Sequence, residues 1–205
     1  MTSLSACLLA FALFTADAAI AADTAVGSVV AVRGAVFTDT AGSLTPLVVD
    51  APVHEGDAIV TRDGKARIAL EDGSIVSVAE NTRVRIGQYE RAPGNVKARL
   101  ALVSGALRLL VARIGRGGHF EVETETAIAA VRGTDWLIEA SPERTSVALL
   151  NGKVAVSGRD ARTAPAVILQ RPGHGTDVRR DQAPTPPVPW GARRLADLLA
   201  RATFN

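Results

Sequence analysis

Short runs of Val, Ile and Leu, separated by pairs in which a residue is followed by Gly, recur along most of this 205-residue chain. The pairs are Arg33-Gly34, Asp72-Gly73, Ser104-Gly105 and Asn151-Gly152. Short apolar runs bounded by glycine turns are typical of β-strands, and the middle of the chain lacks the 3.6-residue apolar period of a helix. The sequence therefore predicts an all-β fold, either a sandwich or an irregular β-solenoid-like domain of short strands and tight turns.

Two of the pairs predict hairpins. Asn-Gly is the preferred type I′ turn because both central positions need a positive φ. Two-residue loops at 151–152 and 104–105 each place apolar residues opposite one another on a common face. The predicted cross-strand pairs are Leu149 with Val154, Val147 with Val156, Leu102 with Leu107 and Leu100 with Leu109.

Composition limits both the core and the partners. Apolar residues make up 47% and charged residues 21%, which is typical of a globular protein, whereas aromatics at 4% leave a core of mainly aliphatic side chains. The 23 basic and 21 acidic residues are mixed along the chain and give a net charge of +2. This balance argues against nucleic acid as a partner.

The N-terminus has the pattern of a signal peptide over residues 1–21. It is apolar from Leu4 to Phe14, and small residues then lead to Ala19-Ile20-Ala21, an A-x-A cleavage pattern. A retained membrane anchor is the alternative, although Asp17 and the alanines make the segment a poor span. We therefore expect a periplasmic protein, exported through its signal peptide, with no stable membrane span after cleavage.

The single cysteine, Cys7, lies inside this segment. The stretch Leu4–Cys7 resembles a lipoprotein box, but there the apolar stretch precedes the cysteine, and here it follows. We interpret Cys7 as a small apolar residue of the signal peptide. Cleavage then leaves a mature chain without disulfides, so that core packing alone holds it together.

The C-terminal region differs from the β-rich part, which we place at 22–182. Residues 183–190 contain four prolines in eight residues and predict an extended linker. Residues 191–205 predict an amphipathic helix, with an apolar face made by Leu195, Leu198, Leu199 and Ala202. This helix either docks on the β domain or binds a partner or a membrane surface through its arginines.

The segment 127–140 changes its strand phase. Ala129 and Val131 place apolar groups on odd positions, whereas Trp136 and Ile138 place them on even ones. A β-bulge or a corner supplies the extra residue, with Gly133 accepting the unusual φ. The motif comprises Val131, Arg132, Gly133, Thr134 and Asp135.

Two interpretations of this motif stay open. In a structural corner, Thr134 bonds the disturbed backbone, and Arg132 binds free carbonyls or a carboxylate of Glu121, Glu123 or Glu125. In a recognition patch, Arg132 and Asp135 face the solvent.

Catalytic and metal-binding motifs are scarce. His54, His119 and His174 have no zinc-ligand spacing, and the sequence contains no Gly-x-Ser-x-Gly elbow, so we expect no metal and no cofactor. Glycosidases use paired carboxylates, but acidic residues next to glycine are more often turn formers. The candidates for such a pair are Asp57, Asp63, Glu71 and Asp72.

Several of these segments together resemble the FecR domain. The matching pieces are Gly56-Asp57, Thr61, Asp72-Gly73-Ser74, Val131-Arg132-Gly133-Thr134 and Leu150–Val154. The resemblance covers about Val26 to Val178, and Val-Arg-Gly-Thr is its most specific element.

The resemblance implies a periplasmic, β-rich, solenoid-like domain of bacterial cell-surface signalling. The best-known members pair with outer-membrane siderophore receptors and regulate an extracytoplasmic-function sigma factor. We expect this chain to lack the cytoplasmic arm for that contact, so only the extracytoplasmic binding domain carries over. The expected function is a non-enzymatic module that recognises a protein or a cell-envelope ligand; the alternative is a β-solenoid enzyme acting on an envelope polysaccharide.

The signal-peptide pattern predicts a mature protein that begins near Ala22 and fractionates with the periplasm. Intact-mass measurement of the exported protein checks this. A mass that retains residues 1–21, or a lipid on Cys7, would contradict it.

Overall fold

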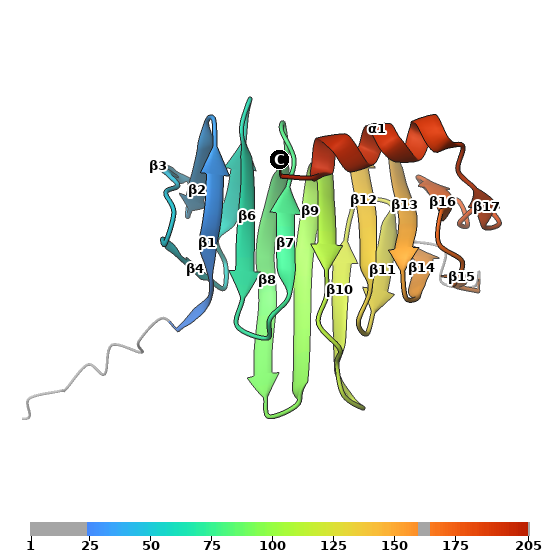
Figure 1. The fold of residues 1–205 in the computed structure, drawn as a ribbon, viewed down its shortest axis with the longest axis horizontal. Coiled ribbons are helices and arrows are strands. Elements are labelled where there is room, and N and C mark those ends of the chain that lie inside the picture. Colours follow the sequence, from blue (N-terminus) through green and yellow to red (C-terminus); the bar gives the residue numbers. More distant parts are fainter. Residues whose placement is uncertain (1–23, 160–164, 205) are drawn as a thin grey trace, which may run out of the picture.

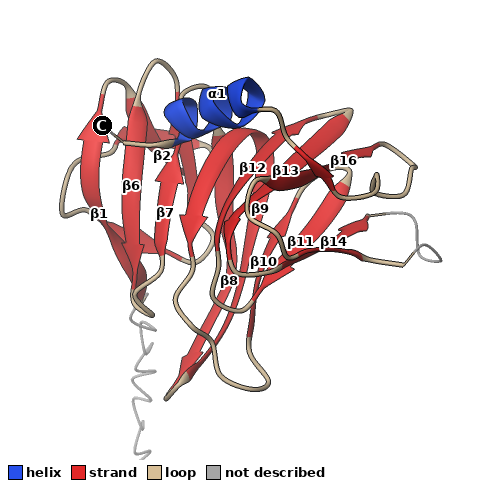
Figure 2. Ribbon diagram, turned by 45° about the vertical axis from the view of Figure 1, so that its right-hand side comes forward, coloured by secondary structure: helices blue, strands red, loops and turns tan. Residues whose placement is uncertain are grey.

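The structure is a computed structural model that describes residues 24–159 and 165–204. Seventeen strands and one helix make up the fold of these residues. The predicted signal peptide lies outside the described residues. The strands form one continuous, open sheet that folds over on itself into two layers, with the helix outside (Figures 1 and 2). The predicted all-β class is confirmed, and the two facing layers correspond to the sandwich alternative.

Each layer is a row of hydrogen-bonded neighbours that includes one half of β9. Layer A contains, in order, β4 (Pro52–His54), β1 (Ala25–Arg33), β6 (Lys65–Leu70), β7 (Ile75–Val78), β9 (Asn95–Leu110), β12 (Asp135–Ser141), β13 (Arg144–Asn151), β16 (His174–Arg179) and β17 (Val188–Pro189). Layer B contains β3 (Ser43–Pro46), β2 (Val36–Thr40), β5 (Ala58–Thr61), β8 (Arg83–Ala92), β9, β10 (His119–Glu123), β11 (Ala127–Val131), β14 (Val154–Gly158) and β15 (Val167–Leu169). All pairs are antiparallel except β9 with β10.

Strand β9 joins the layers by bending at Gly105. Its even-numbered residues face the core before the bend, as Leu102 does, and its odd-numbered residues, such as Leu107, face it afterwards. Gly105 has a φ of +96°, and a Cβ there would lie 2.2 Å from the Thr82 hydroxyl oxygen. Only glycine fits this bend.

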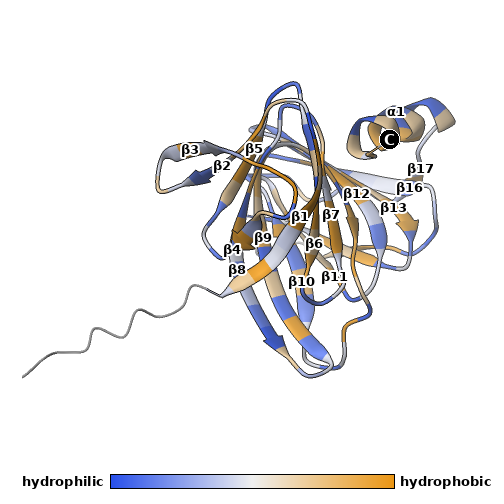
Figure 3. Ribbon diagram, turned by 60° about the vertical axis from the view of Figure 1, so that its left-hand side comes forward, coloured by the Kyte–Doolittle hydropathy of each residue, from blue (hydrophilic) through white to orange (hydrophobic). Residues whose placement is uncertain are grey.

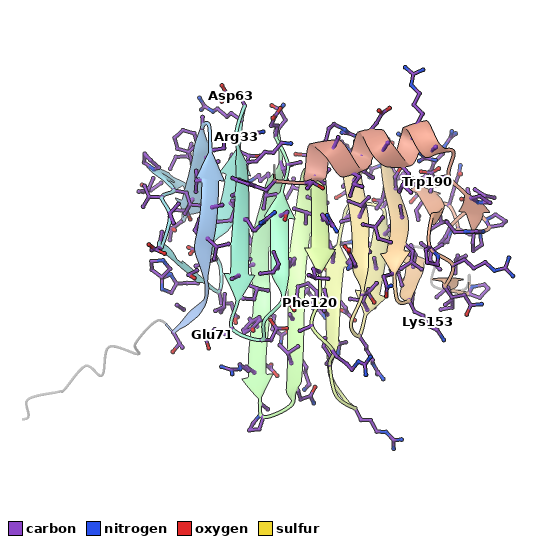
Figure 4. All side chains as sticks on the ribbon, viewed as in Figure 1. Arg33, Asp63, Glu71, Phe120, Lys153 and Trp190 are labelled. Carbon is purple, nitrogen blue, oxygen red and sulfur yellow. The ribbon has the colours of Figure 1, made fainter. Side chains whose placement is uncertain are left out.

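The chain changes layers at both ends of its strands. Up to the bend of β9, the strands β1, β5 and β7 each lead into the other layer at the end marked by Arg33 and Asp63 in Figure 4, called here the Arg33 end. The short strand β4 lies between layer B strands β3 and β5 in the chain, and residues 55–57 lead from it into layer B at the opposite end. After the bend, β9, β11, β13 and β15 each lead into the other layer at the opposite end, marked by Lys153 and called the Lys153 end. The remaining β-hairpins stay within one layer.

The core lies between the two layers and is aliphatic, as the composition predicted. One apolar cluster joins layer A residues such as Ile68 to layer B residues such as Ile59, and Phe120 and Trp136 are its largest fully buried side chains. Figure 3 shows apolar residues along the strands of both layers and α1 apart from them. With no cysteine in the described residues, burial of apolar area is the main stabilising contribution.

The two predicted hairpins at 104–105 and 151–152 are wrong. Leu107 pairs with Ile138 and Val78 in layer A, whereas Leu102 pairs with Val84 in layer B. The pair at 151–152 likewise leads from β13 in layer A to β14 in layer B. A positive φ suits a layer crossing as well as a tight turn, so the residue–Gly pair did not distinguish them. The pair at 72–73 does lie in a hairpin, between β6 and β7.

The Pro-rich segment 183–190 is part of the domain rather than a free linker. Its last residues form β17, which pairs with β16. The Thr185 hydroxyl accepts the backbone N–H of Asp177 at 3.0 Å. Trp190 is buried, and the absence of a side chain at Gly175 leaves room for its ring.

The C-terminal helix α1 (Ala192–Ala202) docks on the outer face of layer A. Leu198 and Ala202 are buried against small outward-facing residues such as Ala106, and Leu195 and Leu199 are partly buried beside them. The apolar face predicted from the sequence is therefore the docked face, which makes the domain-docking alternative correct.

Charged contacts surround this apolar contact. Lys65 Nζ donates to the carbonyl oxygens of Ala200 at 3.1 Å and Thr203 at 3.3 Å, where a cation suits the negative end of the helix dipole. At the other end, Arg194 binds Asp177 through contacts of 2.6 and 3.0 Å. Burial alone would raise the pKa of Asp177, but hydrogen bonds from Arg194 and Ser146 outweigh it and lower that pKa.

Leu198→Ala is expected to lower the free energy of unfolding by about 2 kcal/mol, because it leaves a void under the helix. The neighbouring exposed residue provides the control, and Asp197→Ala is expected to stay within about 0.5 kcal/mol of wild type. Urea denaturation measures both. Equal midpoints for the two variants would show that α1 does not depend on this contact.

Candidate interaction surfaces

The 132–134 segment is the corner at which the chain leaves β11 in layer B and enters β12 in layer A. The core lies on opposite sides of the chain in the two layers. The crossing therefore moves the core-facing residues from odd positions in β11 to even positions in β12, which accounts for the change of phase. Gly133 has a φ of +112°, and a Cβ there would lie 3.1 Å from the Arg113 Cα. The positive φ expected at Gly133 is present.

Thr134 and Val131 hold this corner from the inside. Val131 is buried in the core, and Thr134 is 4% exposed. The Thr134 hydroxyl donates to the carbonyl oxygen of Lys153 at 2.9 Å, and its backbone exchanges hydrogen bonds with Val111. The corner is thus bonded to the neighbouring crossings on both sides.

Arg132 points away from this bonded corner. It is exposed and makes no hydrogen bond or ion pair with the described residues. The three glutamates considered as partners bind other arginines: Glu121 and Glu123 pair with Arg99, and Glu125 pairs with Arg180. The expected contact of Arg132 with carbonyls or carboxylates does not form. Glu121 and Glu123 lie on the outer face of layer B, in β10, and Glu125 lies in the connection between β10 and β11.

Asp135 begins β12 on the outer face of layer A and binds Arg108 of β9 in bidentate geometry. The contacts are Nε to Oδ1 at 3.1 Å and Nη2 to Oδ2 at 2.8 Å. The hydrogen bonds to Asp135 raise the pKa of Arg108. The bidentate geometry also fixes the position of the guanidinium group. The residues of the motif therefore have different environments. Val131 lies in the core, Gly133 and Thr134 form the corner, Arg132 faces the solvent and Asp135 lies on the outer face of layer A.

Arg108 in turn lines a hollow of about 460 Å³ beside the end of α1, called here the outer groove. Its lining residues are Val30, Arg67, Ile75, Ser77, Arg108, Leu110 and Thr203. Val30 and Leu110 are 43% and 52% exposed, so the groove presents two large apolar side chains to the solvent. The groove thus combines an exposed apolar surface with two guanidinium groups.

Arg67 is held over this groove by the C-terminal residues. Its Nη2 donates to the carbonyl oxygen of Phe204 at 3.2 Å, and its guanidinium carbon lies 5.5 Å from the centre of the Phe204 ring. Its Nε atom is buried without a hydrogen-bond partner among the described residues. The sequence analysis missed Arg67 and Arg108; their signal is a charged residue at an outward position of an apolar strand.

The four carboxylates of the enzymatic alternative do not come together. Asp63 lies at the Arg33 end and Glu71 at the opposite end (Figure 4). Asp57 accepts hydrogen bonds from the His54 backbone and the Thr40 hydroxyl, and Asp72 accepts two from Ser74. Asp57 and Asp72 are thus turn-forming residues.

Glu71 does line a second hollow, of about 640 Å³, together with Glu55, Tyr89 and Arg91. Glu71 forms an ion pair with Arg91 at 3.0 Å, and Glu55 accepts the backbone N–H of Tyr89 at 3.1 Å. Burial raises the pKa of Tyr89. Both carboxylates are already engaged by neighbouring groups.

Two of the histidines lie beside carboxylates. His54 lies 3.5 Å from Asp57, and His119 lies 3.8 Å from Glu121. Among residues 24–159 and 165–204, no three His, Cys, Asp or Glu side chains are grouped so that they could hold a metal ion. The helix in the described part of the chain is not long and apolar enough to cross a membrane.

Comparison with known proteins confirms the resemblance found in the sequence. Residues 57–155 match the family model described as FecR protein. This range includes Gly133, the bend of β9 and most of the crossings at the Lys153 end. No curated protein matches the chain.

Two crystal structures, at 1.65 and 2.50 Å, of a protein described as a putative anti-sigma factor from Parabacteroides distasonis ATCC 8503 share the fold. Each has a TM-score of 0.55 and 20% sequence identity, and the alignment covers 68% of this chain and 62% of that chain. The chain thus spans less than two thirds of that protein's length, and the likeness concerns the fold.

Gly133→Val is expected to destabilise the domain by about 1–3 kcal/mol, because a β-branched side chain is strained at this φ and would press on Arg113. Arg132→Ala is the neighbouring control and is expected to change stability by less than about 0.5 kcal/mol, since the side chain is exposed. Thermal denaturation measures both. A Gly133→Val protein as stable as wild type would rule out the corner.

Proposed function

We propose, from the premise that residues 57–155 form a FecR domain, that the protein is a non-enzymatic signalling module of the bacterial periplasm that recognises a protein partner. The observation that carries this proposal is the outer groove, in which exposed apolar side chains lie beside fixed guanidinium groups. The fold shared with the protein described as a putative anti-sigma factor is consistent with a regulatory role. The proposal does not include contact with a sigma factor.

The chemistry of the outer groove favours a protein segment as its occupant. Val30 and Leu110 offer apolar area that gains free energy when a partner covers it. Arg67 and Arg108 place two guanidinium groups beside this apolar area, and a carboxylate of the partner would complement their charge. The expected partner segment therefore presents apolar side chains together with an acidic residue.

Binding at this groove would also act on α1. Thr203 lines the groove, and Arg67 contacts Phe204, so an occupant that reorients Arg67 would disturb the C-terminal end of the helix. Lys65, two residues before Arg67, holds the last carbonyls of the same helix. The groove and α1 thus form a connected unit through which binding could change the exposed surface of layer A.

Strand β9 offers a matched pair of variants for testing this proposal. Leu110 lies in the outer groove, and Val103, on the same strand, faces the outside of layer B; they are 52% and 54% exposed. A photo-crosslinking amino acid at position 110 is expected to give a protein adduct in the cell envelope, whereas one at position 103 is not. Leu110→Asp is expected to abolish partner capture and Val103→Asp to preserve it, both with wild-type melting temperatures. Equal crosslinking at the two positions would contradict a partner site in the groove.

A further inference from the structure

The four layer crossings that follow the bend of β9, all at the Lys153 end, carry a row of basic side chains. The connections are residues 111–118 between β9 and β10, 132–134 between β11 and β12, 152–153 between β13 and β14, and 170–173 between β15 and β16. They contain five basic residues and no acidic residue. The row, called here the basic rim, consists of Arg113, Arg116, Arg132, Lys153 and Arg171.

The crossings lie side by side because their strands are neighbours in both layers. β9, β12, β13 and β16 are consecutive in layer A, and β10, β11, β14 and β15 are consecutive in layer B. Direct contacts agree with this order: Gly133 lies against Arg113, and Gly152 lies against the Gly133 carbonyl. Three strand spacings of about 4.8 Å place the basic rim along roughly 15 Å.

All five side chains of the basic rim are free to meet a ligand. Each is exposed, and none forms a hydrogen bond or an ion pair with residues 24–159 or 165–204. Elsewhere on the surface most arginines are engaged, for example Arg99 with Glu121 and Arg180 with Glu143. The other layer crossings differ in charge. Residues 62–64 and 79–82 at the Arg33 end contain Arg62 but also Asp63 and Glu80, and residues 55–57, at the same end as the rim but before the bend of β9, contain Glu55 and Asp57.

The chemistry of the basic rim favours a phosphate surface over a protein. Stable protein interfaces centre on buried aromatic or aliphatic anchors. None of the large apolar side chains exposed in the described part of the chain lies in the four crossings. A row of flexible cations without such anchors suits an array of anionic headgroups, where each Lys or Arg near the surface contributes electrostatic attraction.

We propose that the basic rim docks this protein on an anionic phospholipid surface, with Arg132 of the Val-Arg-Gly-Thr motif as one of its contacts. In this orientation the strands stand upright on the bilayer, and the outer groove, on the face of layer A, stays accessible from the side. The proposal goes beyond the signalling function and does not depend on it, because the rim and the groove use different residues.

Vesicle sedimentation tests the proposal, using protein purified after expression of the full chain. Wild type is expected to bind vesicles containing phosphatidylglycerol, to ignore vesicles of phosphatidylcholine alone, and to dissociate as salt is raised. The variant R132Q/K153Q/R171Q is expected to bind the anionic vesicles about a hundredfold more weakly. The control R85Q/R179Q/R193Q removes the same charge from exposed arginines outside the rim and is expected to bind nearly as wild type.

Three outcomes would overturn the proposal. Equal loss in both triple variants would show an effect of net charge alone, and no binding to anionic vesicles would leave an acidic protein as the ligand of the rim. Displacement by inorganic phosphate, beyond that by sulfate at equal ionic strength, would show a small-anion site. Partner capture through the groove is measured separately with Leu110→Asp, so failure of one proposal does not imply failure of the other.

Discussion

The two-layered sheet depends on side-chain hydroxyls that replace ladder hydrogen bonds where the chain leaves one layer for the other. At the Arg33 end, the Thr61 hydroxyl donates to Ala79 at 2.6 Å, and the Thr82 hydroxyl accepts the Ala106 N–H at 3.0 Å. At the Lys153 end, Thr134 bonds Lys153 in the same way. A backbone group buried at a corner without such a partner costs free energy comparable to a lost hydrogen bond, so these threonines are what makes tight crossings possible.

Glycines with a positive φ are the second feature that permits the bend and the layer crossings. At Gly105 and Gly133 the backbone takes a positive φ while a neighbouring segment comes close. A Cβ would overlap the Thr82 hydroxyl at Gly105 and would make a tight contact of 3.1 Å with the Arg113 Cα at Gly133. At the Lys153 end, Gly133 rests on Arg113 and Gly152 rests on the Gly133 carbonyl, so three of the crossings form a continuous edge. Arg132 and Lys153, next to these two glycines, are exposed.

The helix α1 explains why layer A has a different outer surface from layer B. It covers the small residues in the part of layer A nearest the Arg33 end and leaves Val30 and Leu110 exposed beyond its last turn. The outer groove is thus made jointly by strand residues and the C-terminal segment. A partner in the groove would act on α1 directly, whereas a surface at the basic rim would set the direction in which the groove faces.

The sequence by itself determined the secondary-structure class, the aliphatic core, the docked face of α1 and the need for glycine at position 133. These features follow from local patterns: the period of two in strands, the period of 3.6 in the helix, and the steric limits on φ. The FecR resemblance was likewise contained in short motifs. Local patterns suffice for such features because each depends on residues close together in the chain.

Only the tertiary structure decided which strands pair and where the charges of the motif go. The residue–Gly pairs at 104–105 and 151–152 have the φ signature of a hairpin, but they are layer crossings, because the ladder partners of their strands lie elsewhere in the chain. Arg108 and Asp135 are 27 residues apart, and their pairing on the outer face follows from the alignment of β9 with β12. Long-range pairing is settled by the total burial of both layers, a quantity that no single segment of the sequence contains.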